Sequence, residues 1–275
     1  MEFVTLNNGV RMPRLGFGVW RIPDDEAAAA VATALEAGYR SIDTAALYRN
    51  EEGVGRALRA AGVPREEVFV TTKLWNDAHG YDAALRAFDA SMERLGLDRL
   101  DLYLIHWPVP AQDLYLEAWR ALERLYADGR VRAVGVSNFT VEHLERVLQE
   151  GSVVPAVNQI ELHPQLPQAE LRGHHAAHGI VTEAWSPLGQ GRGLLDEPVL
   201  AGVAARHGVT PAQVVLRWHL RLGNVVIPKS VTPSRIAENL DVFGFELDDA
   251  DMEAIASLDA GRRLGPDPAT FNQVH

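Results

Sequence analysis

The chain has 275 residues, 47% of them hydrophobic and 23% charged, which is the composition of an ordinary globular protein with a sizeable buried core. A formal net charge of -11 argues against general nucleic-acid binding, and the absence of cysteine excludes disulfides and thiolate metal sites. The N-terminus MEFVTLNNGV has no secretory signal pattern, and no stretch reaches the about 18 apolar residues of a membrane span. We therefore expect a cytoplasmic protein with no membrane or nucleic-acid partner.

Short apolar segments alternate with helical patterns from one end of the chain to the other. Near the N-terminus, Asn8-Gly9 in FVTLNNGVRMP predicts the turn of a β-hairpin. The helical patterns commonly end on glycine, the residue that favours the left-handed conformation after a helix. Eight segments rich in Val, Ile and Leu predict strands at 15–20, 41–45, 68–75, 100–108, 131–138, 157–164, 180–188 and 224–230.

This alternation predicts the fold class. Continuous apolar strands separated by helices indicate a parallel sheet that is covered on its outer face. Eight such units without a linker or a break in composition favour a single α/β domain, a (β/α)8 TIM barrel over residues 1–275, rather than a doubly wound sheet. Residues 246–259 predict an extra C-terminal helix, which an irregular tail follows.

Polar side chains stand at or near the ends of most predicted strands. In a barrel these ends meet at one mouth, where the active sites of this fold lie. For any single residue a structural ion pair is the simpler explanation, but the repetition around the barrel favours a site. The residues concerned are Asp43, Lys73, His106, Ser137, Asn138, Gln159, Trp185, Ser186, Lys229 and Ser230.

Three of these positions, together with Tyr48, predict a proton-donating centre. Asp43 and Lys73 end neighbouring strands, so the two side chains can pair and tolerate burial together. The ammonium group of Lys73 would lower the pKa of Tyr48, which follows five residues after Asp43, and so prepare it as a general acid. His106 on the next strand would donate a hydrogen bond to the same substrate oxygen. This constellation suits the reduction of a carbonyl group by a bound hydride donor.

Three segments resemble the characteristic segments of the aldo-keto reductase family, in the same order and at similar spacing. They are GYRSIDTAALYRNEEGVG (38–55), MERLGLDRLDLYLIHWP (92–108) and IPKSVTPSRIAENLDVFGFEL (227–247). The chain is most similar to the prokaryotic branch that includes 2,5-diketogluconate reductases. Members of the family are often monomers, so the resemblance implies a monomer. The resemblance implies that Tyr48 is the proton donor, that Asp43 and Lys73 tune it, and that His106 orients the carbonyl.

The resemblance also implies an NADPH site. Ser137, Asn138 and Gln159 would hold the nicotinamide carboxamide, and Trp185 would stack on the nicotinamide ring. Gly16 and Gly18 lack the third glycine of a dinucleotide fingerprint, because Arg21 stands there. A phosphate would instead bind at the last strand and the start of its helix, beside the adenine at Asn239. The remaining cofactor positions are Ser186, Leu188, Lys229, Ser230, Val231, Thr232 and Arg235.

Lys229, Ser230, Thr232 and Arg235 form a basic cluster in the sequence. The alternative to a phosphate site is a helix cap by Thr232 or Ser234, with the basic side chains solvated. Because the cluster lies at the predicted barrel mouth, we expect the phosphate site and a preference for NADPH over NADH.

The substrate pocket is predicted from aromatic residues at the strand ends. Together with Leu47, His106 and the tail residue Phe271, they would line an apolar pocket above the nicotinamide. The connection 109–113 is short, which predicts an open site for small aldehydes and ketones, including dicarbonyls or keto sugar acids. The aromatic residues concerned are Trp20, Trp75 and Trp107.

Two alternative functions remain open at this stage. A metal-dependent barrel hydrolase or isomerase would need several convergent ligands, and only Asp43, His106 and His163 are available at strand ends. A catalytically weak, cofactor-sensing regulatory subunit would share the fold. His174 and His178 stand four residues apart on a predicted helix, but with no acidic partner in the pattern we expect no metal site there.

Overall fold

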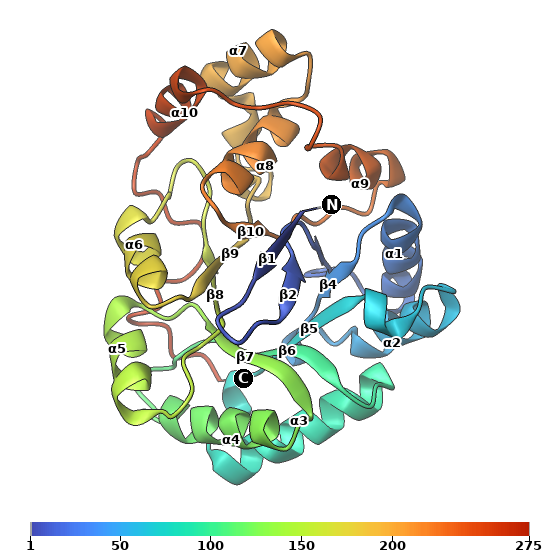
Figure 1. Cartoon of the computed structure of the whole chain (residues 1–275), viewed down its shortest axis with the longest axis vertical. Coiled ribbons are helices and arrows are strands. Elements are labelled where there is room, and N and C mark those ends of the chain that lie inside the picture. The colour runs from blue at the N-terminus through green and yellow to red at the C-terminus, as the bar shows by residue number, and fades with distance from the viewer. Residues whose placement is uncertain (1, 275) are drawn as a thin grey trace.

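The computed structural model, which describes residues 2–274, is an eight-stranded parallel barrel surrounded by helices (Figure 1). Every strand lies inside one of the predicted apolar segments, and neighbouring strands pair in chain order. A bridge between Leu15 and Val226, with the Gly16 N–H donating to the Val226 carbonyl at 2.9 Å, joins the last strand to the first. The strands are β3 (Phe17–Gly18), β4 (Ser41–Asp43), β5 (Phe69–Leu74), β6 (Leu100–Ile105), β7 (Val131–Ser137), β8 (Val157–Glu161), β9 (Val181–Trp185) and β10 (Val225–Val226).

Helices form a ring around the strands in Figure 1, and their ends follow local sequence signals. Thr140, Thr210 and Asp248 begin three of them with capping boxes, while Gly38 and Gly96 end two others in the left-handed conformation. The helices are α1 (Asp24–Ala37), α2 (Glu51–Ala60), α3 (Tyr81–Leu95), α4 (Tyr115–Ala127), α5 (Val141–Glu150), α6 (Ala169–Ala177), α7 (Pro198–His207), α8 (Pro211–Arg221), α9 (Pro233–Leu240) and α10 (Asp249–Ala256). Helix α10 is the predicted extra helix.

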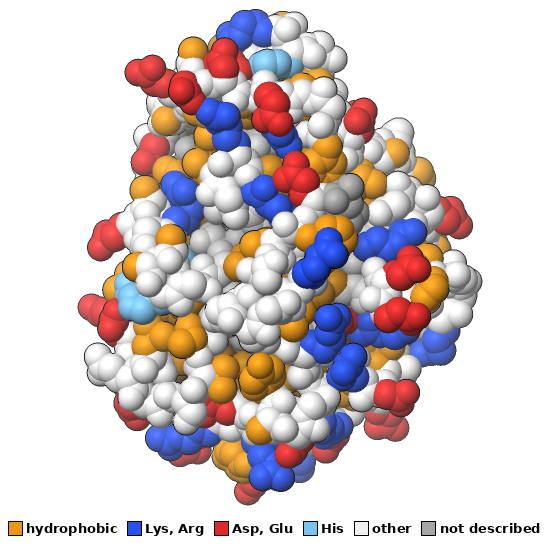
Figure 2. All heavy atoms as spheres, in the orientation of Figure 1, with side chains coloured by type: hydrophobic (Ala, Val, Ile, Leu, Met, Phe, Trp, Pro, Cys, Tyr) orange, Lys and Arg blue, Asp and Glu red, His pale blue; other side chains and the backbone are white. Residues whose placement is uncertain are grey.

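The N-terminal hairpin closes one end of the barrel. Strands β1 (Phe3–Thr5) and β2 (Arg11–Pro13) lie across the centre of the view in Figure 1. Buried Leu6 and Met12 pack on the first residues of several barrel strands, including Phe69, Val157 and Val225. The space-filling view of this face shows charged side chains of both signs spread between apolar ones (Figure 2). Because the hairpin covers the amino ends of the strands, their carboxyl ends form the mouth.

The irregular C-terminal tail is fixed to residues at that mouth by buried Glu161, the last residue of β8. The backbone N–H groups of Leu264 and Gly265 donate to its two carboxylate oxygens at 2.6 and 2.9 Å. Burial opposes the charge of Glu161, but these bonds and one from His163 hold its pKa below the usual range. A Cβ at Gly265 would lie 2.6 Å from the Trp185 ring, so only glycine allows this close approach.

Most of the core lies between the strands and the helix ring. Large side chains with no more than 1% exposure, such as Phe88, Tyr103 and Trp119, fill this layer. No helix among residues 2–274 is long and apolar enough to cross a membrane.

Candidate active site

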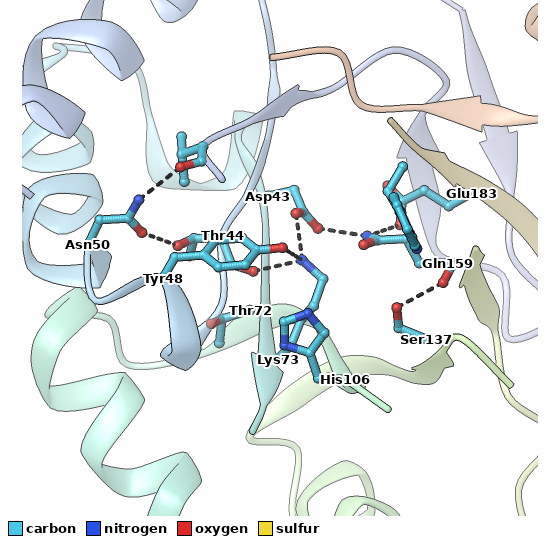
Figure 3. Close-up of polar contacts among 12 residues, drawn as sticks. Asp43, Thr44, Tyr48, Asn50, Thr72, Lys73, His106, Ser137, Gln159 and Glu183 are labelled. Atoms are coloured by element: carbon cyan, nitrogen blue, oxygen red, sulfur yellow. Dashed lines mark hydrogen bonds and ion pairs between the residues drawn. The ribbon is translucent and has the colours of Figure 1, made fainter. Parts of the chain in front are cut away.

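A buried ion pair lies at the centre of the barrel mouth. Asp43 is the last residue of β4, and Lys73 is in β5, its side chain fully buried. The Lys73 Nζ lies 2.6 Å from Asp43 Oδ1, donates to the Thr44 carbonyl at 2.9 Å, and reaches the Tyr48 hydroxyl at 3.5 Å. Tyr48 ends the short 3-10 helix η1 (Ala46–Tyr48), and its ring points toward the pair in Figure 3. The structure therefore brings together the two predicted strand-end residues and the predicted proton donor, Tyr48.

The predicted direction of the Tyr48 pKa is wrong for the protein without ligands. Burial raises the pKa of the Tyr48 hydroxyl, and the charge of Lys73 lowers it by less, so the net shift is upward. Asp43 adds to the upward shift. For Lys73 burial favours the neutral amine, but Asp43 outweighs it and raises the pKa of the ammonium group. The centre is thus a neutral phenol beside a stable cation, which is the protonation state a proton donor requires.

His106 follows β6 directly and packs edge-on against Tyr48 and Trp75, with ring centroids 5.7 and 5.2 Å away. Burial, with a smaller contribution from the Lys73 charge, lowers the pKa of His106 well below the usual range. The imidazole is therefore neutral near pH 7, with one N–H available to donate. Its Nδ1 makes no hydrogen bond to any described residue.

The structure also brings a second buried carboxyl group to this centre, one that the sequence analysis missed. Gln159 on β8 donates from Nε2 to Asp43 Oδ2 at 2.8 Å and to Glu183 Oε2 at 2.9 Å (Figure 3). Glu183 lies in the middle of β9, fully buried. The available signal was a charged residue inside the apolar run IVTEAW. Glu161 carried the same kind of signal at the end of β8.

Three predicted nicotinamide-binding residues form one network beside Gln159. Ser137 Oγ donates to the Gln159 carbonyl at 2.8 Å, and Asn138 Nδ2 donates to Ser137 Oγ at 3.1 Å. The Trp185 indole N–H donates to Asn138 Oδ1 at 2.8 Å, which fixes the tryptophan at the mouth. Asn138 and Ser186 both have positive φ, 62° and 51°. Residues other than glycine rarely adopt this backbone conformation, and those that do cluster at active sites and ligand-binding sites.

The basic cluster lies at the N-terminus of α9. Lys229 and Arg235 are exposed, and neither forms an ion pair with any residue between 2 and 274. Thr232 is the N-cap residue, but its side chain makes no capping hydrogen bond, so the alternative of a Thr232 cap is not supported. Ser230 Oγ accepts one N–H, from Thr232, at 3.1 Å. Two free cations and a helix N-terminus form a ready anion site.

Other predicted cofactor residues differ in exposure. Asn239 is buried on α9, Val231 is exposed, and Leu188 packs against the core.

Part of the predicted substrate wall is assembled by packing. Trp75 and Trp107 are buried together, and Phe271 from the tail lies 4.4 Å from Trp107 between ring centroids. Trp185 packs against the same cluster. The cluster also contains Val109 and Val274, which the sequence analysis did not single out.

Two residues of the predicted wall lie outside this cluster. Trp20 is covered by the Arg21 guanidinium, 4.1 Å from its ring, and Leu47 is 37% exposed.

No group of three metal ligands lies at the mouth among residues 2–274. One such group lies on the outside of the barrel. His174 and His178 on α6 approach Glu145 on α5, and His174 Nε2 is 3.5 Å from Glu145 Oε1. The sequence pattern gave no acidic partner for these histidines, and Glu145 is one that it missed, because α5 and α6 are neighbours only in the folded chain.

Comparisons with known proteins point to one family. Residues 14–260 match the model of the aldo/keto reductase family. The chain is 61% identical over 269 residues to an aldo-keto reductase of Mycolicibacterium smegmatis, covering 98% of both chains. It is 54% identical to methylglyoxal reductase DkgA of Escherichia coli over 98% of this chain and 97% of the relative. A crystal structure of a Gox0644 mutant in complex with NADPH is similar at a TM-score of 0.94, with 53% identity and 98% coverage of both chains.

Proposed function

The chain belongs to the aldo/keto reductase family, and from this membership we propose that it reduces small aldehydes and ketones to alcohols with NADPH as the hydride donor. The observation that carries the proposal is the buried Asp43–Lys73 pair, with Lys73 Nζ 3.5 Å from the Tyr48 hydroxyl. In this arrangement Tyr48 can donate a proton, and the Lys73 ammonium group can stabilise the phenolate that remains.

The residues present fit a phosphorylated dinucleotide. Lys229 and Arg235, which form no ion pair among residues 2–274, lie at the start of α9 and suit a 2′-phosphate, which NADPH has and NADH lacks. At the other end of the mouth, the amide groups of Asn138 and Gln159 suit a carboxamide, and the flat Trp185 ring suits stacking. NADPH supplies the hydride that the carbonyl carbon receives.

The chain's own residues handle the oxygen. His106, neutral because of burial, donates a hydrogen bond to the carbonyl oxygen and fixes its orientation. As negative charge builds on that oxygen, the Tyr48 hydroxyl transfers its proton to it, and the product is the alcohol. Lys73 stabilises the resulting phenolate, and Asp43 keeps Lys73 charged. A proton from solvent then restores Tyr48.

The substrate class follows from the short connection 109–113 and the aromatic cluster around Trp107. We expect compact carbonyl compounds, with methylglyoxal first because relatives such as DkgA are methylglyoxal reductases. The test is NADPH oxidation by the purified protein with methylglyoxal, phenylglyoxal, an aromatic aldehyde and a keto sugar acid. Turnover with one or more supports the proposal. Tight NADPH binding with no turnover in the panel overturns it in favour of a regulatory role.

The basic cluster predicts a cofactor preference that one substitution tests. Arg235→Ala is expected to raise the KM for NADPH about 10- to 100-fold, since a hydrogen bond to a charged group contributes roughly 1.5–3 kcal/mol. The KM for NADH is expected to stay within about twofold. The matched control is Arg86→Ala, which removes the same charge from the exposed face of α3. An equal loss with both cofactors contradicts a role for Arg235 in binding the 2′-phosphate.

A further inference from the structure

Glu183 is a buried carboxyl group that the proposed reaction does not use. In the parallel sheet it lies between Gln159 on β8 and Val225 on β10, in register with both. Its Oε2 accepts a hydrogen bond from Gln159 Nε2 at 2.9 Å, and its Oε1 has no partner among residues 2–274. Figure 3 shows Gln159 between Asp43 and Glu183. A carboxyl group in this position must act on Gln159, on the charges near it, or on both.

The two carboxyl groups fix the orientation of the Gln159 amide. Asp43 Oδ2 and Glu183 Oε2 take both N–H groups of Nε2, at 2.8 and 2.9 Å. Because both neighbouring oxygens accept hydrogen bonds, the NH₂ end of the Gln159 amide faces them. Only the Gln159 Oε1 is left to accept a hydrogen bond from a ligand. Loss of the Glu183 oxygen would free one N–H and let the amide rotate.

The charges around Glu183 decide its protonation state. Asp43 from β4 and Lys73 from β5 face it. These two residues already form an ion pair with each other, with Lys73 Nζ 2.6 Å from Asp43 Oδ1. Tyr48 from η1 is a neutral phenol, and the flanking strands contribute the uncharged Gln159 and Val225. A second buried anion would have no cation of its own, which is costly. Burial, followed by the Asp43 charge, accordingly raises the pKa of Glu183 from 4.5 to about 8.

We propose that Glu183 is a positioning residue that works as a neutral carboxylic acid, orienting the Gln159 amide for the cofactor while leaving Lys73 free to stabilise the Tyr48 phenolate. The proposal rests on the proposed reductase function. When Glu183 loses its proton to solvent at alkaline pH, a second negative charge forms beside Asp43. That charge disfavours a phenolate at Tyr48, so proton donation slows.

The first test detects the proton itself and needs neither cofactor nor substrate. Infrared spectra of the protein without ligands are compared between wild type and Glu183→Gln from pH 6 to pH 10. We expect a protonated-carboxyl C=O band in wild type that disappears as pH rises through about 8 and that the variant lacks. A wild type without such a band overturns the proposal, whatever its activity.

Folding stability gives an independent check of the same proton. Between pH 4.5 and about 8 the folded protein holds the Glu183 proton and the unfolded chain does not. The stability that the folded protein gains by retaining this proton is therefore fully present below pH 4.5 and is lost as pH rises toward 8. The melting temperature of Glu183→Gln relative to wild type is expected to rise over this interval. A constant difference contradicts a neutral Glu183.

The positioning role is tested by kinetics across pH. Glu183→Ala is expected to raise the KM for NADPH and lower kcat/KM about tenfold near neutral pH, since it frees one N–H of Gln159. Glu183→Gln keeps an acceptor oxygen and is expected to restore most of that loss, with no decline in kcat between pH 7 and 9. Equal losses in both variants, or an unchanged alkaline decline in Glu183→Gln, overturn the positioning role. A wild type that shows the infrared band but reduces no carbonyl leaves Glu183 protonated and refutes the reductase proposal instead.

Discussion

Tyr48→Phe is expected to lower kcat for carbonyl reduction by about 10²- to 10⁴-fold, the usual contribution of a positioned general acid. The phenyl ring retains the edge-on contact with His106, but the hydroxyl group that lies 3.5 Å from Lys73 Nζ is lost. NADPH binding, measured by fluorescence titration, is expected to change little because the proposed cofactor contacts lie on other residues.

The matched control for Tyr48→Phe is Tyr81→Phe, which removes the same hydroxyl from an exposed tyrosine at the start of α3. Its kcat should equal that of wild type. If Tyr48→Phe keeps more than about a tenth of the wild-type kcat, another group donates the proton. If it also loses NADPH, the substitution has disturbed the site rather than the chemistry.

Lys73→Met is expected to destabilise the fold by about 3–5 kcal/mol and to abolish turnover. The Lys73 side chain is fully buried, and its ammonium group is held by Asp43 and the Thr44 carbonyl. Methionine fills a similar volume without a charge, so Asp43 keeps its hydrogen bond from Gln159 but is left as a buried anion without a compensating cation. Urea denaturation near pH 7 measures the loss of stability.

A second variant separates charge from packing at this pair. Lys73→Met combined with Asp43→Asn removes both charges, and we expect it to recover at least half of the lost stability while remaining inactive. Recovery of turnover in the double variant would contradict a role for Lys73 in stabilising the phenolate. A single variant that loses less than about 1 kcal/mol would show that the ion pair is not the reason for the burial of Asp43.

The local sequence pattern was enough to predict the barrel and most of its proposed catalytic centre. Each apolar segment contains one strand, and the order of parallel strands places Asp43, Lys73 and His106 at the same edge. Tyr48 follows because η1 begins three residues after β4 ends. The basic cluster around the start of α9 was also predicted from IPKSVTPSR, whereas only the structure shows that Lys229 and Arg235 form no ion pair among residues 2–274.

Contacts across the barrel could not be predicted from the local sequence pattern. Asp43 and Glu183 are 140 positions apart in the printed sequence, and Gln159 joins them only because the sheet closes on itself. The direction of the Tyr48 pKa shift depends on how far burial outweighs a neighbouring charge, which no spacing encodes. The anchoring of the tail by Glu161 and the approach of Glu145 to His174 likewise depend on segments that meet only after folding.

The sequence by itself determined the parallel barrel, the polar strand ends and the place of the proposed proton donor beside its cation, because periodicity and strand order act through neighbours along the chain and across one sheet edge. Only the tertiary structure decided which side chains share the closed interior. It added Glu183 to the Asp43–Lys73 pair and fixed the Gln159 amide between two carboxyl groups. The physical reason is that desolvation and cross-barrel electrostatics depend on distances through space, which spacing along the chain does not set.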